Sequence, residues 1–235
     1  MRLICFITLC FIFSTTVRAQ EPEDFSMKGK SVGVYFTRKH FSYDDSYLIP
    51  LSQFIKSDQG VSTTVEDIEM QALVSIGRLF VEQADSFLDA DSIFFLNENP
   101  VYAKIFMNHY NSNDHFLRRT DSLRGADLIA VVNPFVLGST KSTTVYTQSN
   151  KIITEPVNVK NGRIRVEFFE PATGYLVGVF EACLDEGNLP RTKVFFNFRN
   201  NESPTGRFIA GLFSVLVTNI NEKRKSNCVI PGSGK

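Results

Sequence analysis

The chain has 235 residues, and its 25 basic side chains balance its 25 acidic ones. This balance gives no electrostatic reason to bind nucleic acid or an anionic membrane surface, so we expect neither as a partner. The length suits a single large apolar core, since a chain of about 200 residues buries roughly 70% of its unfolded surface.

The first 19 residues have the features of a cleaved export signal. Arg2 precedes an uninterrupted apolar run from Leu3 to Phe13, and the segment ends in Val17-Arg18-Ala19, which fits a signal peptidase site. The run is shorter than the roughly 20 residues of a membrane helix, and no later run approaches that length. We therefore expect a periplasmic or secreted mature chain without a membrane span.

After the signal, we expect a flexible N-terminus over residues 20–29, a single α/β domain over 30–226 and a disordered tail over 227–235. The predicted mature chain keeps two cysteines, Cys183 and Cys228. In an oxidising compartment they could form a disulfide, which would close a loop of about 45 residues and stabilise the fold by about 4 kcal/mol. The alternative is a buried free thiol at Cys183 and a second one on the tail.

The first half of the domain predicts strands that alternate with helices. We expect strands over residues 31–37, 92–97 and 126–138, and helices over 63–88 and 99–110. Thr63 and Glu66 have the spacing of a capping box at the start of the long helix, and Pro100 suits the first turn of the second. This order is typical of a βαβαβ unit with parallel strands.

After Gly138 the pattern changes to strands alone, which predicts an antiparallel meander. We expect these strands over residues 142–148, 151–159, 163–170, 175–184 and 193–199. Asn161-Gly162 is the strongest hairpin signal in the chain, because a two-residue turn of this type needs positive φ at both central positions. Pro171 to Gly174 predicts a second turn. Arg163, Arg165 and Glu167 alternate with apolar residues, which indicates a solvated face with cross-strand ion pairs.

An amphipathic helix closes the domain. Ser203 is a suitable N-cap and Pro204 a suitable first residue, while Lys223 to Lys225 follow where the helix dipole favours positive charge. Its apolar stripe comprises Phe208, Ile209, Leu212, Phe213, Leu216, Val217 and Ile220. With this helix packed on the sheet, the predicted fold class is α/β (α+β), a mixed sheet in two or three layers.

The histidines, cysteines and acids do not form a metal-binding pattern. His109 and His115 are six residues apart, which places them on nearly opposite faces of a helix, and His40 is distant in the sequence. Asp44 and Asp45 are not followed by the spaced oxygen ligands of a calcium loop. We therefore predict no metal and no cofactor.

Two loops hold the candidate functional residues. The loop predicted over residues 38–50 contains Phe41, Tyr43, Asp44, Asp45 and Tyr47, which suit a glycan or peptide site. His40 and the two aspartates could also meet Ser139 and Lys141 of a second loop, since both loops follow strands and clefts form at the carboxyl ends of strands. Such a meeting would favour a hydrolase, provided that the groups lie within hydrogen-bond reach.

Several motifs resemble known exported proteins. Gly125-Ala126-Asp127 leads into a predicted strand, and Glu170 to Gly174 forms a turn between two late strands. With the leading strand and helix, these motifs resemble the periplasmic α/β domain of the curli-secretion lipoprotein CsgG and the N-terminal domain of TolB, over most of residues 30–222. Asp91-Ser92-Ile93 and Asp121-Ser122-Leu123 resemble the triplets that carry O-glycans in exported Bacteroidetes proteins. The fold resemblance implies a non-catalytic domain that works by association in the cell envelope.

These observations favour an exported, non-enzymatic envelope protein that acts by protein–protein association, in assembly or transport of surface material. Its partner would be another envelope protein or a second copy of the chain. A glycan- or peptide-binding module is the first alternative and a hydrolase the second.

Overall fold

A computed structural model describes residues 25–37, 41–44, 65–98, 110–111, 116–117, 125–148, 151–188 and 204–228. The predicted signal peptide and the predicted strand over 193–199 lie outside these ranges. So does the predicted helix over 99–110, except for its last residue.

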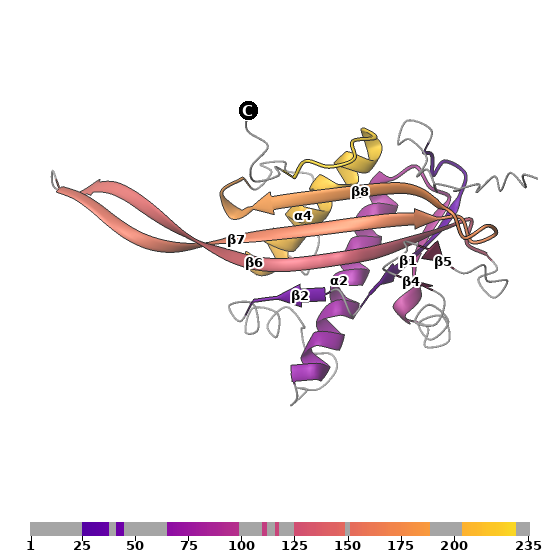
Figure 1. Ribbon diagram of the computed structural model, residues 1–235, viewed down its shortest axis with the longest axis horizontal. Coiled ribbons are helices and arrows are strands. Elements are labelled where there is room, and N and C mark those ends of the chain that lie inside the picture. The colour runs from indigo at the N-terminus through magenta and orange to yellow at the C-terminus, as the bar shows by residue number, and fades with distance from the viewer. Residues whose placement is uncertain are drawn as a thin grey trace, which may run out of the picture.

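One mixed sheet of six strands forms the frame of the molecule (Figure 1). Its strands are β1 (Ser31–Phe36), β2 (Phe41–Tyr43), β3 (Ser92–Phe95), β6 (Leu128–Gln148), β7 (Lys151–Phe169) and β8 (Leu176–Asp185). Their order is β3-β1-β6-β7-β8, and β2 pairs with β6 farther along the chain than β1 does. The pairings of β1 with β3 and β6 are parallel, as predicted, whereas β7 and β8 continue the sheet antiparallel.

Four short elements complete the described chain. A 3-10 turn follows β3 as η4 (Leu96–Glu98), and another follows β8 as η5 (Glu186–Asn188). The strands β4 (Tyr110–Asn111) and β5 (Phe116–Leu117) form a separate antiparallel pair.

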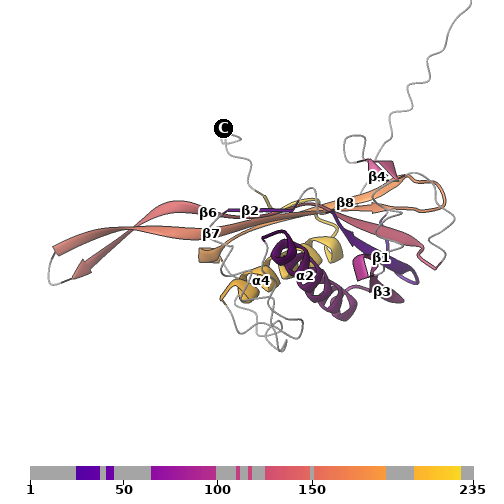
Figure 2. The same cartoon turned by 90° about the horizontal axis from the view of Figure 1, so that it is seen from below.

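Two helices, α2 (Val65–Phe87) and α4 (Pro204–Asn221), cover one face of the sheet (Figure 2). The predicted apolar stripe of α4 is buried along its whole length, because this helix faces the sheet and α2 together. The mixed sheet with a C-terminal helix packed on it confirms the predicted fold class. In the described part of the chain, no helix is both long enough and apolar enough to cross a membrane.

The predicted hairpin turn at Asn161-Gly162 is wrong, since both residues lie inside β7 and pair with residues 138 and 137 of β6. Gly162 does not have a positive φ. A Cβ at this position would lie 3.0 Å from side-chain atoms of Phe208 and of Leu212 on α4. The glycine therefore serves the close approach of helix to sheet, and the dipeptide only imitates a turn.

Long strands replace the short ones of the predicted meander. The predicted strands over 126–138 and 142–148 are one strand, β6, and those over 151–159 and 163–170 are one strand, β7. A bulge between Val132 and Phe135 contains a cis peptide before Pro134. The second predicted turn is confirmed, because the Gly174 amide donates to the Glu170 carbonyl (2.7 Å) at the connection to β8.

The packed body begins earlier than predicted. Phe25 is 5% exposed and lies within the segment expected to be flexible. Its ring packs against Phe168 and Phe180, with centroids 4.7 and 5.2 Å apart. A Cβ at Gly178 would meet the same ring at 2.8 Å, so this glycine leaves room for it.

The second face of the sheet is less solvated than the alternation of β7 predicts. Arg163 forms the expected cross-strand pair with Glu181 of β8 (2.6 Å). Glu167, however, is fully buried, and Arg165 of the same strand pairs with it over 2.9 Å. It lies opposite Val131, in a small apolar cluster of Tyr35, Leu96, Ile129, Val131 and Phe169. Burial in this cluster raises the pKa of the Tyr35 phenol.

Candidate interaction surface

Two of the three predicted binding aromatics, Phe41 and Tyr43, contact other residues of the protein. Phe41 stacks on Phe135 of β6, with ring centroids 5.4 Å apart. Tyr43 donates a hydrogen bond to Glu69 of α2 (2.9 Å). Both residues belong to β2, which corrects the prediction of an exposed loop at this position. The remaining predicted residues, Asp45 and Tyr47, lie outside the described part of the chain.

The two loops predicted for a hydrolase meet at one contact. Ser139 donates to the Asp44 carboxylate over 2.7 Å, and the Asp44 amide donates to the Leu137 carbonyl. The predicted histidine, His40, lies outside the described residues, so the structure does not place it relative to this contact. Lys141 is exposed. The contact lies where the pairing of β2 with β6 ends.

The carboxyl ends of β1 and β3, where open α/β sheets bind ligands, are closed by one side chain. Asn97 accepts a hydrogen bond from the Phe36 amide (2.9 Å) and donates one to the Phe36 carbonyl (3.0 Å). Both backbone groups at this strand end are therefore satisfied inside the protein. Across the described ranges, no group of three or more histidines, cysteines or acids could hold a metal ion.

The distal parts of β6 and β7 form a feature that the sequence prediction missed. Residues 140–148 and 151–159 pair with each other in nine successive positions, from Thr140 opposite Val159 to Gln148 opposite Lys151. At about 3.4 Å per residue this ribbon is roughly 30 Å long, and Figure 1 shows it projecting beyond every other element. We call residues 140–148 and 151–159 the arm. One signal was available, because no glycine occurs between Gly138 and Gly162.

Two acidic side chains bind β6 and β7 where the neighbouring strands β2 and β8 end and the arm begins. We call the rest of the described structure the body. On the outer side of β6, Asp44 accepts from Ser139 immediately after β2 ends. On the outer side of β7, Glu186 accepts a hydrogen bond from the Lys160 amide (3.2 Å) immediately after β8 ends. Beyond these two caps, no other described strand pairs with the arm. Its two outer edges therefore carry backbone groups that lack a strand partner within the described chain.

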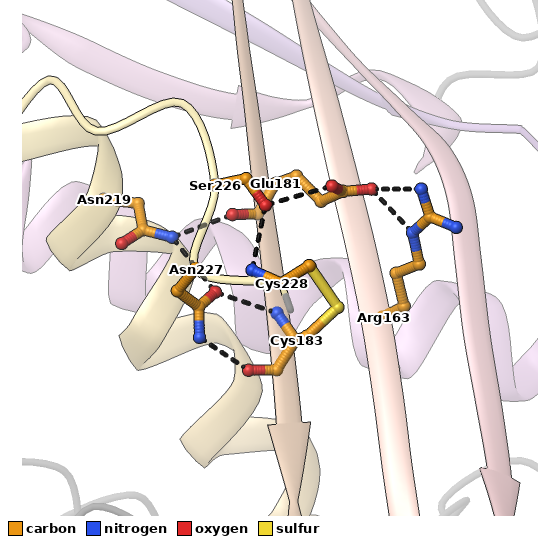
Figure 3. Close-up of a disulfide and its surroundings, with 7 residues drawn as sticks. All are labelled: Arg163, Glu181, Cys183, Asn219, Ser226, Asn227 and Cys228. Atoms are coloured by element: carbon orange, nitrogen blue, oxygen red, sulfur yellow. Dashed lines mark hydrogen bonds and ion pairs between the residues drawn. A yellow bond between two sulfur atoms is a disulfide. The ribbon is translucent and has the colours of Figure 1, made fainter. Parts of the chain in front are cut away.

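The outer edge of β8 is covered by the C-terminal segment of the chain (Figure 3). Cys228 forms a disulfide with Cys183 of β8, so the bonded alternative is the one present. Asn227 accepts from the Cys183 amide (3.0 Å) and donates to the Cys183 carbonyl (2.8 Å), and the Lys225 carbonyl accepts from the Glu181 amide (2.9 Å). We call residues 225–228 the clamp. Asn227 and Cys228, predicted to begin a disordered tail, therefore belong to the body.

The predicted glycosylation triplets are described only in part. Ser92 opens β3 and is exposed, with its hydroxyl 3.2 Å from that of Ser31. The triplet that contains Ser122 lies outside the described residues. An exposed hydroxyl on an edge strand is open to modification, but nothing else around Ser92 distinguishes it.

Comparison with known proteins gives no family assignment. No family model and no curated protein matches the chain. A solved structure from Helicobacter pylori, described as a homologue of the neuraminyllactose-binding hemagglutinin, is 9% identical with a TM-score of 0.39, covering 85% of this chain and 91% of that chain. The hypothetical protein CT253 from Chlamydia trachomatis is 11% identical with a TM-score of 0.38, covering 84% and 98%. At these scores neither structure carries information about function.

Proposed function

We propose that this chain is an exported protein of the cell envelope that acts by protein–protein association, with the arm as its contact element. The observation that carries the proposal is the extension of β6 and β7 beyond every neighbouring strand. A two-stranded ribbon is at best marginally stable in water. Its open edges are templates for a further strand, and a partner that adds one supplies the missing hydrogen bonds.

Two further features support this assignment. The signal-like segment ending at Ala19 and the disulfide between Cys183 and Cys228 both suit an oxidising compartment outside the cytoplasm. The aromatic side chains of β2 contact other parts of the protein: Phe41 stacks on Phe135 of β6, and Tyr43 donates a hydrogen bond to Glu69 of α2. Association is therefore better supported than glycan or peptide binding at Phe41 and Tyr43, or than hydrolysis at Ser139.

A variant without the arm tests the proposal. Residues 141–158 are replaced by Asn-Gly, which joins Thr140 to Val159 through a two-residue hairpin turn. We expect this variant to fold with a similar thermal midpoint and to lose the partners that the full chain captures from envelope extracts after cross-linking. Arg78→Ala, which removes an exposed ion pair between α2 and Glu98 of η4, is the control and should capture the same partners as the wild type does. Capture of the same partners by the armless variant would contradict the proposal.

Export has its own test. When the chain is expressed with its N-terminal segment, N-terminal sequencing of the purified protein should begin at Gln20, and the intact mass should correspond to residues 20–235. An unprocessed chain recovered from the cytoplasm would refute the proposed location. A mass above that of the bare chain would instead direct attention to Ser92 and Ser122.

A further inference from the structure

Hydrogen bonds at residues 137 and 160, next to the arm, show which backbone groups of the arm point away from the β6–β7 pair. The Leu137 carbonyl of β6 accepts from Asp44, and the Lys160 amide of β7 donates to Glu186, so both residues direct their backbone groups outward. Along a strand, the backbone N–H and C=O groups of successive residues point alternately inward, to the paired strand, and outward, away from it. Counting from residues 137 and 160, the residues whose backbone groups point outward are 141, 143, 145 and 147 on β6, and 152, 154, 156 and 158 on β7.

The two outer edges of the arm differ at one residue. Pro156 of β7 lies opposite Thr143 of β6 and is an outward residue. Proline has no amide hydrogen, so it interrupts the row of donors on the β7 edge. The outward residues of β6 are Lys141, Thr143, Val145 and Thr147, and each has an amide that can donate. Only the β6 edge therefore offers an uninterrupted row for a new strand.

We propose that the strand added to this edge is β6 of a second copy of the chain, antiparallel and related by a twofold axis at Thr144. The inference rests on the proposed function and names its partner. In this register residue 141 lies opposite 147 of the second copy and 143 opposite 145, which gives about eight backbone hydrogen bonds, two for each bonded pair. The result is a four-stranded sheet with the order β7-β6-β6-β7.

Charge and symmetry favour the twofold contact of β6 with β6 over a head-to-tail contact in which β6 of one copy pairs with β7 of the next. Lys141 is the single charged residue of the β6 arm, and the twofold register places it opposite Thr147 instead of another lysine. Without residues 1–19, which contain Arg2 and Arg18 and no acid, the chain has 23 basic and 25 acidic side chains, and this small net charge does not make two copies repel each other strongly. A head-to-tail contact would bring the β6 edge against the β7 edge, where Pro156 interrupts the donors.

A matched pair of proline variants tests the proposal, because Val145 and Thr154 lie opposite each other and both direct their amides outward. Neither substitution removes a hydrogen bond between β6 and β7. Val145→Pro should weaken dimerisation at least tenfold in sedimentation equilibrium of the full exported chain, whereas Thr154→Pro should leave it unchanged. Equal effects of the two variants, or an effect of Thr154→Pro alone, would overturn the proposed edge.

Cysteine cross-linking tests the axis. Across a non-hydrogen-bonded antiparallel pair the Cα atoms are about 4.5 Å apart, which suits a disulfide. Thr144→Cys should therefore give a covalent dimer under mild oxidation, and the matched Ser142→Cys should not, because its two copies are offset by four residues. Equal cross-linking of both would overturn the register. A wild type that stays monomeric, while the armless variant still loses its envelope partners, would refute the second copy and leave the proposed function standing.

Discussion

The β8 edge and the β6 edge of the arm both offer backbone groups to a further strand, but the described part of the chain covers only the first of them. Around Glu181 and Cys183, the clamp supplies hydrogen bonds and a disulfide. Along residues 140–148, no described segment does the same. Proteins commonly protect exposed edges against unwanted pairing. This contrast supports the proposal that a partner strand pairs with the β6 edge of the arm.

Of the changes that test the contrast between the two edges, loss of the disulfide should have the largest effect on stability. The double variant Cys183→Ser/Cys228→Ser should lower the free energy of unfolding by about 4 kcal/mol, since the bond closes a loop with a sequence separation of 45 residues. Urea denaturation with and without reductant measures it. Reductant should destabilise the wild type and leave the variant unchanged. A denaturation midpoint equal to that of the oxidised wild type would mean that the clamp holds without its covalent bond.

A smaller effect is expected where α4 holds the base of the arm. Gly162→Ala should destabilise the protein by about 2 kcal/mol, because the new methyl group would press on Phe208 and Leu212. Gly187→Ala is the matched control, since no atom lies within 4 Å of a Cβ at that position. Thermal unfolding compares the two. Similar midpoints for both variants would show that helix and strand can separate at no measurable cost.

The non-covalent part of the clamp should contribute less. Asn227→Ala removes both hydrogen bonds to the Cys183 backbone and should cost about 1 kcal/mol. Asn227→Asp keeps the acceptor and loses the donor, so we expect about half of that effect. Hydrogen exchange should show faster exchange of the Cys183 amide in the alanine variant only. Unchanged exchange there would assign the protection to the disulfide alone.

The smallest effect belongs to the cap at the start of the arm. Glu186→Ala should change the free energy of unfolding by about 0.5 kcal/mol or less, because this side chain is partly exposed. Exchange of the Lys160 amide should nevertheless become faster, as its acceptor is lost. Glu186→Gln retains an oxygen acceptor and should keep the protection. Equal exchange in both variants would place the end of the body elsewhere.

Local patterns predicted the elements whose neighbours are near in the sequence or whose apolar faces are unmistakable. The stripe from Phe208 to Ile220 predicted α4, and the apolar run after Asp127 predicted a strand, whose first residues are buried. The turn between Glu170 and Gly174 was also predicted, because its glycine adopts a positive φ that few other residues tolerate.

The errors arose where one residue type serves two purposes. Glycine is required both in tight turns and where a helix approaches a strand closely, so Asn161-Gly162 predicts a turn although Gly162 packs against α4. Glu167 alternates as a solvated residue does, but Arg165 and the apolar cluster bury it. Phe25 follows the polar residues 20–24, and nothing local indicates that it packs against Phe168.

By itself, the sequence determined the fold class, the covering helix and the pair of cysteines that were able to bond, because apolar periodicity and residue chemistry are local properties. Only the tertiary structure decided which edges of the sheet are covered. Strand pairing depends on how far each neighbour extends, and β2 and β8 end where Asp44 and Glu186 bind β6 and β7. The lack of glycine between Gly138 and Gly162 permits long strands, but only these long-range contacts determine where the neighbouring strands end and the arm begins.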